Sequence, residues 1–87
     1  MAQGIGTQIE GLRYKLGLNQ TDFGKLFSTT PMSVSRWERD VNQPEARDLL
    51  KLGLLASEAG MYGWCFWQHA GLTRAEARAM LGRAGRL

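Results

Sequence analysis

The run from Ser35 to Arg39, SRWER, is the part of this sequence whose side chains are best suited to recognition chemistry. On a helix it places polar and cationic groups on one side, while Val34 and Trp37 fall on the other. A guanidinium group such as that of Arg36 donates two parallel hydrogen bonds to a pair of acceptors, as on an anion or on the edge of a guanine base. We therefore expect a helix that packs inward with one face and presents a polar edge outward.

The sequence offers little for other kinds of chemistry. Its single cysteine, Cys65, and single histidine, His69, cannot form an internal disulfide or a zinc ligand set. No nucleophile–base pair is recognisable, and the glycines of GIGTQIEG (residues 4–11) lack the preceding strand that a dinucleotide-binding loop requires. We expect no enzymatic activity, cofactor or metal, and we expect Cys65 to act as a small buried apolar residue.

The net charge of +3 is unevenly distributed along the chain. Residues 9–60 contain seven cations and seven anions, whereas the last 27 residues contain four arginines and one glutamate. Arg74 and Arg78 of this last segment lie one helical turn apart and could reach DNA flanking a binding site. Bulk charge therefore does not identify the first part of the chain as nucleic-acid-binding, and the placement of individual charges is the relevant feature.

Length and composition predict one small soluble protein. With 87 residues and 44% hydrophobic residues, the chain can form a modest core, which a second subunit would help to stabilise. No apolar run approaches the ~20 residues of a membrane span, and residues 1–6 do not resemble a secretory signal. We expect a cytoplasmic, nucleoid-associated location.

Apolar spacing and capping signals predict an all-α fold of about six short helices that position the SRWER run. The first runs from Gln8 to Leu16, with Thr7 and Glu10 as a capping box and Gly17 as its stop. The second starts after Asn19 as its N-cap. The third helix and the loop after it carry the residues suited to recognition.

The third helix starts at Pro31, with Thr30 as its N-cap. Gly24, inside the second helix, costs roughly 1 kcal/mol against alanine, which indicates that the following helix approaches closely there. A loop over residues 39–43 then leads to Pro44 and a leucine-rich helix from Glu45 to about Ala56.

The C-terminal third has a different composition, rich in aromatic residues. A helix is predicted from about Met61 to Ala70, followed by a Thr73–Glu76 capping box and a short helix through Leu81. Interfaces between proteins favour aromatic side chains, so we expect a dimer or partner surface here. Its candidate residues are Tyr62, Trp64 and Trp67. We divide the chain into residues 5–59 and a C-terminal extension, residues 60–87.

Residues 9–56 resemble the phage repressor and Cro-like family of helix-turn-helix proteins, also called the XRE family. The resemblance is carried by LRYKLGLNQTDFGKLF, by VSRWERD, and by Pro44 with the leucine-rich helix after it. Gln20 at the start of the second helix, SRWER, and a proline five residues later form a specific combination. The resemblance implies a five-helix repressor-like domain, here with an extra aromatic-rich helical hairpin.

The resemblance also implies roles for individual residues. Residues facing base edges would be Pro31, Met32, Ser33 and Arg36. Residues near the DNA backbone would be Gln20, Arg39, Asn42 and Gln43. Arg13 and Glu38 match a family ion pair, and each also interrupts an apolar face, where a partly buried charge needs a partner.

Three positions depart from the commoner family pattern. Pro31 and Met32 are apolar and could contact only a thymine methyl group, which leaves Arg36 as the strong candidate for reading a guanine. Asp40 stands where glycine is common in the family. Aspartate tolerates a left-handed conformation, but its charge is unfavourable near phosphates.

Two classes of function are open from the sequence. The first is a repressor-like, sequence-specific transcriptional regulator that binds double-stranded DNA as a homodimer on a palindromic operator, with residues 31–39 in the major groove. The second is an antitoxin or protein-interaction module that uses the C-terminal aromatic surface.

Overall fold

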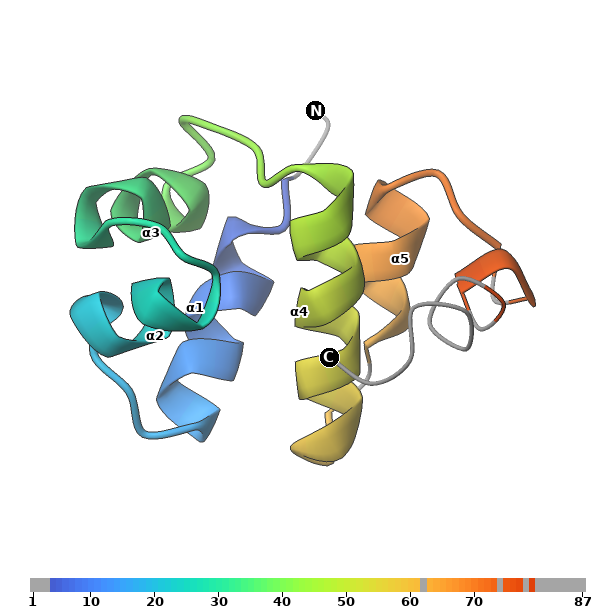
Figure 1. The fold of residues 1–87 in the computed structure, drawn as a ribbon, viewed down its shortest axis with the longest axis horizontal. Helices are drawn as coiled ribbons and strands as arrows, with labels where there is room; N and C mark the ends of the chain where they lie inside the picture. Colours follow the sequence, from blue (N-terminus) through green and yellow to red (C-terminus); the bar gives the residue numbers. More distant parts are fainter. Residues whose placement is uncertain (1–3, 62, 74, 78, 80–87) are drawn as a thin grey trace. The chain divides into compact units, whose positions relative to one another are not determined.

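The structure is a computed structural model that describes residues 4–61, 63–73, 75–77 and 79, and none of these residues lies in a β-strand. Its helices are α1 (Gly6–Lys15), α2 (Gln20–Leu26), α3 (Pro31–Glu38), α4 (Ala46–Glu58) and α5 (Trp64–His69) (Figure 1). The predicted all-α class is therefore confirmed for the described residues.

The chain divides into two compact units, unit 1 (Met1–Pro44) and unit 2 (Glu45–Leu87). This division differs from the predicted boundary at residues 59 and 60. The reason is that α4 packs against α5 and so belongs with the C-terminal segment.

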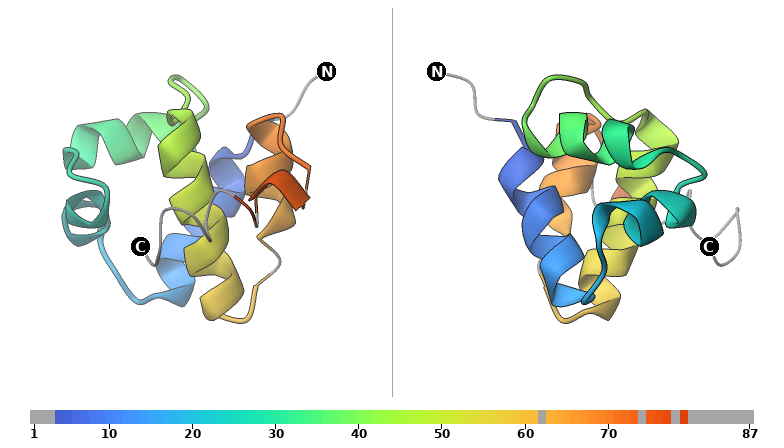
Figure 2. Two further views of the ribbon diagram at one scale, coloured as in Figure 1. Left: turned by 45° about the vertical axis from the view of Figure 1, so that its right-hand side comes forward. Right: turned by 90° about the vertical axis from the view of Figure 1, so that its left-hand side faces the viewer.

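In unit 1, α3 packs against both α1 and α2 (Figure 2). The aromatic rings of this unit meet between the helices: Phe27 lies 5.1 Å from Phe23 and 5.7 Å, edge-on, from Trp37, measured between ring centroids. Apolar side chains from all three helices are buried, which follows from their helical spacing. They are Ile9, Leu12, Phe23, Val34 and Trp37.

The starts of α2 and α3 are capped as predicted. The Asn19 side chain accepts a hydrogen bond from the Asp22 backbone N–H at 2.7 Å. The Thr30 hydroxyl accepts one from the Ser33 N–H at 3.1 Å, with Pro31 in the first turn. These bonds satisfy donors that a helix cannot satisfy by itself, so both helix starts are fixed by their own sequence.

The predicted start of α1 is wrong. The helix begins at Gly6, and Thr7, the predicted N-cap, lies inside it, while the actual N-cap residue Ile5 makes no side-chain capping bond. The Gly6 N–H instead donates to Asp40 Oδ1 at 3.0 Å. The capping acceptor is supplied from the loop after α3, which a local sequence pattern cannot reveal.

Gly24 allows the chain to approach α2 closely, as predicted, although the contact is with the turn rather than with α3 itself. A Cβ atom at Gly24 would lie 2.8 Å from the Thr29 carbonyl oxygen. The turn over residues 27–30 contains Ser28, whose φ of 53° is left-handed. Gly24 and Ser28 together bring the start of α3 against α2.

In unit 2, α4 and α5 approach each other closely at two glycines, Gly53 in α4 and Gly63 at the N-cap of α5. A Cβ at Gly53 would overlap the indole of Trp67, and a Cβ at Gly63 would overlap the Gly53 carbonyl oxygen. The Trp67 indole N–H donates to the Leu50 carbonyl oxygen at 3.2 Å. Among the described residues of unit 2, Leu49, Leu52, Ala56, Phe66 and Ala77 are buried apolar residues.

The predicted capping box of the last helix is present. The Thr73 N–H donates to Glu76 Oε1 and the Glu76 N–H donates to the Thr73 hydroxyl, both at 3.1 Å. Residues 75–77 and 79 are helical. The predicted end at Leu81 lies outside the described residues. No described helix has both the length and the apolar character needed to cross a membrane.

Candidate nucleic-acid interface

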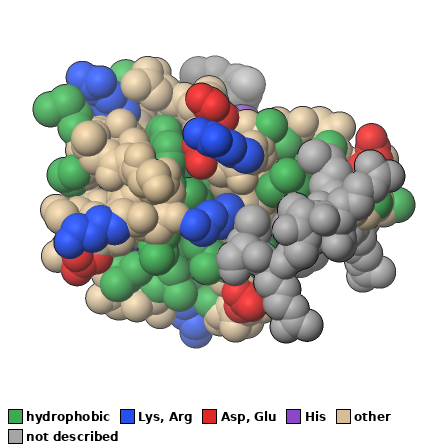
Figure 3. All heavy atoms as spheres, viewed as in Figure 1, with side chains coloured by type: hydrophobic (Ala, Val, Ile, Leu, Met, Phe, Trp, Pro, Cys, Tyr) green, Lys and Arg blue, Asp and Glu red, His purple; other side chains and the backbone are tan. Residues whose placement is uncertain are grey.

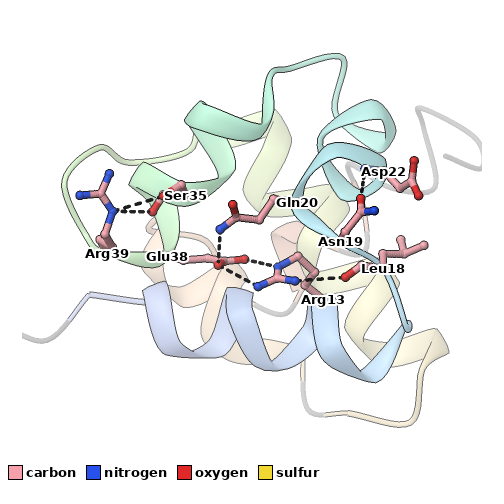
Figure 4. A network of polar contacts seen from close by, with 8 residues as sticks. All are labelled: Arg13, Leu18, Asn19, Gln20, Asp22, Ser35, Glu38 and Arg39. Atoms are coloured by element: carbon pink, nitrogen blue, oxygen red, sulfur yellow. Dashed lines mark hydrogen bonds and ion pairs between the residues drawn. The ribbon is translucent and has the colours of Figure 1, made fainter.

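Arg13 of α1 and Glu38 of α3 form an ion pair, as the sequence suggested (Figure 4). Arg13 Nε donates to Glu38 Oε2 at 2.6 Å, and Arg13 Nη2 donates to Glu38 Oε1 at 3.2 Å. The two side chains are only 9% and 5% exposed. A third guanidinium nitrogen, Nη1, donates to the Leu18 carbonyl oxygen at 3.1 Å. The hydrogen bond to Glu38 raises the pKa of Arg13 above its ordinary value.

Gln20 joins the same network. Its side-chain amide donates to Glu38 Oε1 at 3.1 Å, so the Glu38 carboxylate accepts three hydrogen bonds from side chains of α1 and α2. We predicted Gln20 as a DNA backbone contact from the family resemblance, which did not indicate its hydrogen bond to Glu38. One of its two side-chain N–H groups is engaged inside unit 1, and the other remains for an external acceptor.

The outward face of α3, taken together with its C-cap residue Arg39, consists of Met32, Arg36 and Arg39, at positions i, i+4 and i+7. All three are exposed, Met32 by 60%. Arg36 makes no side-chain hydrogen bond or ion pair within the described part of the chain. Arg39 Nε donates to the Ser35 carbonyl and hydroxyl oxygens, both at 3.3 Å, and the end of its guanidinium points away from Glu38 (Figure 4). This face is roughly 10 Å long at the helical rise of 1.5 Å per residue.

The other predicted contact residues lie around this face. Pro31 is exposed at the start of α3, and Asn42 and Gln43 are exposed in the loop that follows α3. Ser33 is half-buried, and its hydroxyl accepts a hydrogen bond from the Thr30 hydroxyl at 3.1 Å. Ser33 is therefore partly engaged in capping α3, while the other three predicted base contacts, Pro31, Met32 and Arg36, are exposed.

The acidic groups of unit 1 are largely engaged within it. Of its four carboxylates, Glu38 pairs with Arg13, Asp22 lies 3.6 Å from Lys25, and Asp40 accepts from the Gly6 N–H. Arg36 and Arg39 therefore face outward without an acidic partner among the described residues. At the left of Figure 3, where Figure 1 shows α2 and α3, the Lys and Arg side chains lie apart from one another.

Two of the residues predicted to form a dimer or partner surface, Trp64 and Trp67, are half-buried in unit 2. The indole of Trp67 packs on Gly53 and bonds to the Leu50 carbonyl oxygen, so it holds α5 against α4. Trp64 is half-buried with contacts of its own, and Tyr62 lies outside the described residues. Sequence reasoning missed Phe66, which is 1% exposed and supplies the main buried ring of α5.

The remaining candidates for other chemistry are the Cys65 thiol and possible metal ligands. Cys65 is half-buried with no disulfide, and burial raises the pKa of its thiol. The described residues contain no group of three or more His, Cys, Asp or Glu side chains that could hold a metal ion. Arg74 and Arg78, whose placement mattered for flanking DNA contacts, lie outside the described residues.

Comparison with known proteins gives no match: no protein-family model, no curated protein and no solved structure is detectably similar to this chain.

Proposed function

We propose that unit 1 binds double-stranded DNA in a sequence-specific manner and that the protein is a repressor-like transcriptional regulator. The observation that carries the proposal is the outward face of α3, where Met32, Arg36 and Arg39 stand one helical turn apart. A four-residue turn, residues 27–30, joins α2 to α3, which is typical of a helix-turn-helix. The ion pair at Glu38 supports the proposal because it holds α3 while leaving this face open.

The proposed contacts follow from side-chain chemistry. In the major groove, Arg36 donates two hydrogen bonds to the O6 and N7 acceptors of a guanine, and Met32 contacts a thymine methyl group. Arg39, Asn42 and the free N–H of Gln20 bind phosphate oxygens, which position the protein but carry little sequence information. Gln43 and Ser33 lie next to these contacts and complete them.

We further propose that two copies bind together. One reading face of roughly 10 Å spans only a few base pairs at 3.4 Å per pair, so a single copy would have low specificity. A homodimer with two-fold symmetry would read half-sites one helical turn apart, ~34 Å, on a palindromic operator.

The test begins with selection of bound duplexes from a random DNA pool, using the full chain. Fluorescence anisotropy with the enriched duplex then compares the wild type with Arg36→Ala and with Lys15→Ala. Lys15 is an exposed cation at the end of α1, so its variant loses the same charge away from α3. We expect Arg36→Ala to weaken binding by about 1–3 kcal/mol and to relax the preference at one base pair. Lys15→Ala should have a much smaller effect.

Two results would contradict the proposal. One is a pool in which no sequence is enriched. The other is an equal loss of affinity in the Arg36 and Lys15 variants, because equal losses would mean that only net charge matters. A stoichiometry of one protein chain per enriched duplex would contradict the homodimer alone.

A further inference from the structure

We propose that Asp40 and the segment Gly4–Gly6 form a clamp that fixes the C-terminal end of α3, so that Asp40 is a positioning residue for the loop after the helix. The clamp is an inference about unit 1 itself. Its consequence for DNA binding rests on the proposed function.

The first component of the clamp is the conformation and bonding of Asp40. Asp40 has a left-handed φ of 59°, which is uncommon for a residue with a side chain. Its Oδ1 accepts the Gly6 N–H at 3.0 Å, across 34 residues of sequence. This bond supplies the side-chain cap that the N-cap residue of α1, Ile5, does not provide. A carboxylate is also favoured at that end of a helix by the helix dipole.

The second component is the absence of side chains on the opposite side of the contact. A Cβ at Gly6 would overlap the Glu38 carbonyl oxygen, and a Cβ at Gly4 would overlap the Asp40 carboxylate. Ile5, between the two glycines, is only 6% exposed and anchors the segment. Both glycines are therefore needed for the chain before α1 to lie against the end of α3.

The clamp acts at the residue that the ion-pair network also holds. The side chain of Glu38 is bound by Arg13 and Gln20, while its backbone carbonyl lies against Gly6. The loop beyond it is closed onto α3, with the Val41 N–H donating to the Arg36 carbonyl oxygen at 2.9 Å. The end of α3 is thus fixed through both its side chain and its backbone.

Two consequences follow for DNA binding. Arg39 and Asn42, the proposed phosphate contacts, lie on either side of Asp40 in the chain, so the clamp sets where they stand. One oxygen of the Asp40 carboxylate, which the sequence suggested would repel phosphates, accepts a hydrogen bond from the start of α1. We infer that its main effect on DNA binding is through position and not through its charge.

The test compares Asp40→Asn with Asp40→Gly in the full chain. Asparagine keeps the acceptor and tolerates a left-handed φ, whereas glycine keeps only the conformation. Both variants have the same net charge, so their comparison isolates the hydrogen bond. NMR measures the amide chemical shift and hydrogen exchange of Gly6, Arg39 and Asn42, and anisotropy measures binding to the enriched duplex.

We expect Asp40→Asn to retain the wild-type Gly6 shift and slow exchange, and Asp40→Gly to lose both and to perturb Arg39 and Asn42. The glycine variant should bind DNA about five to ten times more weakly than the asparagine variant, the factor that about 1–1.4 kcal/mol produces. Gly6→Ala should weaken binding as well, while Gly11→Ala, where a Cβ meets nothing within 4 Å, is the matched control and should not.

The clamp, the effect of Asp40 on DNA binding and the proposed function would each be contradicted by a different result. A Gly6 amide unaffected by Asp40→Gly would rule out the clamp. Equal affinities of the asparagine and glycine variants, including an equal gain over the wild type, would show that Asp40 acts on DNA through its charge alone. If the wild type enriches no duplex, the proposed function fails, and the NMR comparison still decides the clamp.

Discussion

Removing the Glu38 carboxylate should be one of the most destabilising single changes in unit 1. In Glu38→Ala, Arg13 stays charged and only 9% exposed, and it loses two of its hydrogen bonds, while Gln20 loses one. Breaking one partner of a buried ion pair costs about 3–5 kcal/mol, because the other charge is left uncompensated. A chain of 87 residues has a total stability of about 4–13 kcal/mol, so the loss is a large share of it.

Two further variants separate charge from shape. Glu38→Gln keeps an acceptor but removes the charge, so we expect an intermediate loss of about 2 kcal/mol. The double variant Arg13→Met/Glu38→Leu replaces the buried charges with apolar groups of similar volume, and it should lie within about 1 kcal/mol of the wild type. Gln20 is half-buried and its freed N–H can then bind water.

The assay is urea unfolding followed by circular dichroism at pH 7, with the free energy of unfolding extrapolated to water. The reasoning would be refuted if Glu38→Ala lost less than about 1 kcal/mol. It would also fail if the double variant were as unstable as Glu38→Ala, since this would mean that the network acts through side-chain shape and not through charge compensation.

Three further predictions use the same unfolding assay or thiol chemistry. Gly24→Ala should destabilise the protein by about 1–3 kcal/mol, because its Cβ would lie 2.8 Å from the Thr29 backbone oxygen. Gly11→Ala, where a Cβ meets nothing within 4 Å, should stabilise it by up to about 1 kcal/mol. Changes in the free energy of unfolding that have the same sign in both variants would contradict this prediction. Ser28→Gly should stabilise by about 0.5 kcal/mol by relieving a left-handed φ, while Ser28→Ala should not. Because burial raises the pKa of Cys65, iodoacetamide should modify the folded protein more slowly at pH 8 than the urea-unfolded chain. The modification rate of the folded protein should keep rising at pH values where that of the unfolded chain levels off. Identical pH profiles for the two states would contradict the raised pKa.

Several helix boundaries could be predicted because their causes are local. The caps at Asn19, Thr30 and Thr73 each involve a donor three residues further along the chain, so a short sequence window contains both partners. Gly17, with φ of 72°, ends α1 for the same kind of reason. In these places the sequence pattern and the fold report the same interaction.

Long-range contacts account for what sequence reasoning missed. The start of α1 depends on Asp40, 34 residues away. The packing of α5 on α4 involves Trp67, whose indole N–H donates to the Leu50 carbonyl oxygen, 17 residues earlier, beside Gly53. A tryptophan at the predicted helical spacing indicates burial or an interface, but the spacing does not say against what.

The candidate site was partly predictable for a similar reason. Arg13 and Glu38 each interrupt an apolar face, and opposite charges in such positions have few alternatives to pairing. Gln20 is the first residue of a helix, where polar residues are common. Its hydrogen bond to Glu38 could therefore not be predicted from the sequence pattern. That the outward face of α3 reads DNA stays a prediction.

The ion pair has a kinetic consequence as well. The contacts between α2 and α3 close a turn of four residues, whereas the bond from Arg13 to Glu38 closes a loop of 25. Closing the longer loop costs more chain entropy, so we expect the two neighbouring helices to associate first and α1 to dock late, after the folding barrier has been crossed. Weakening the pair would then raise the unfolding rate and leave the folding rate nearly unchanged. In this view, Arg13 and Glu38 determine the lifetime of the folded unit.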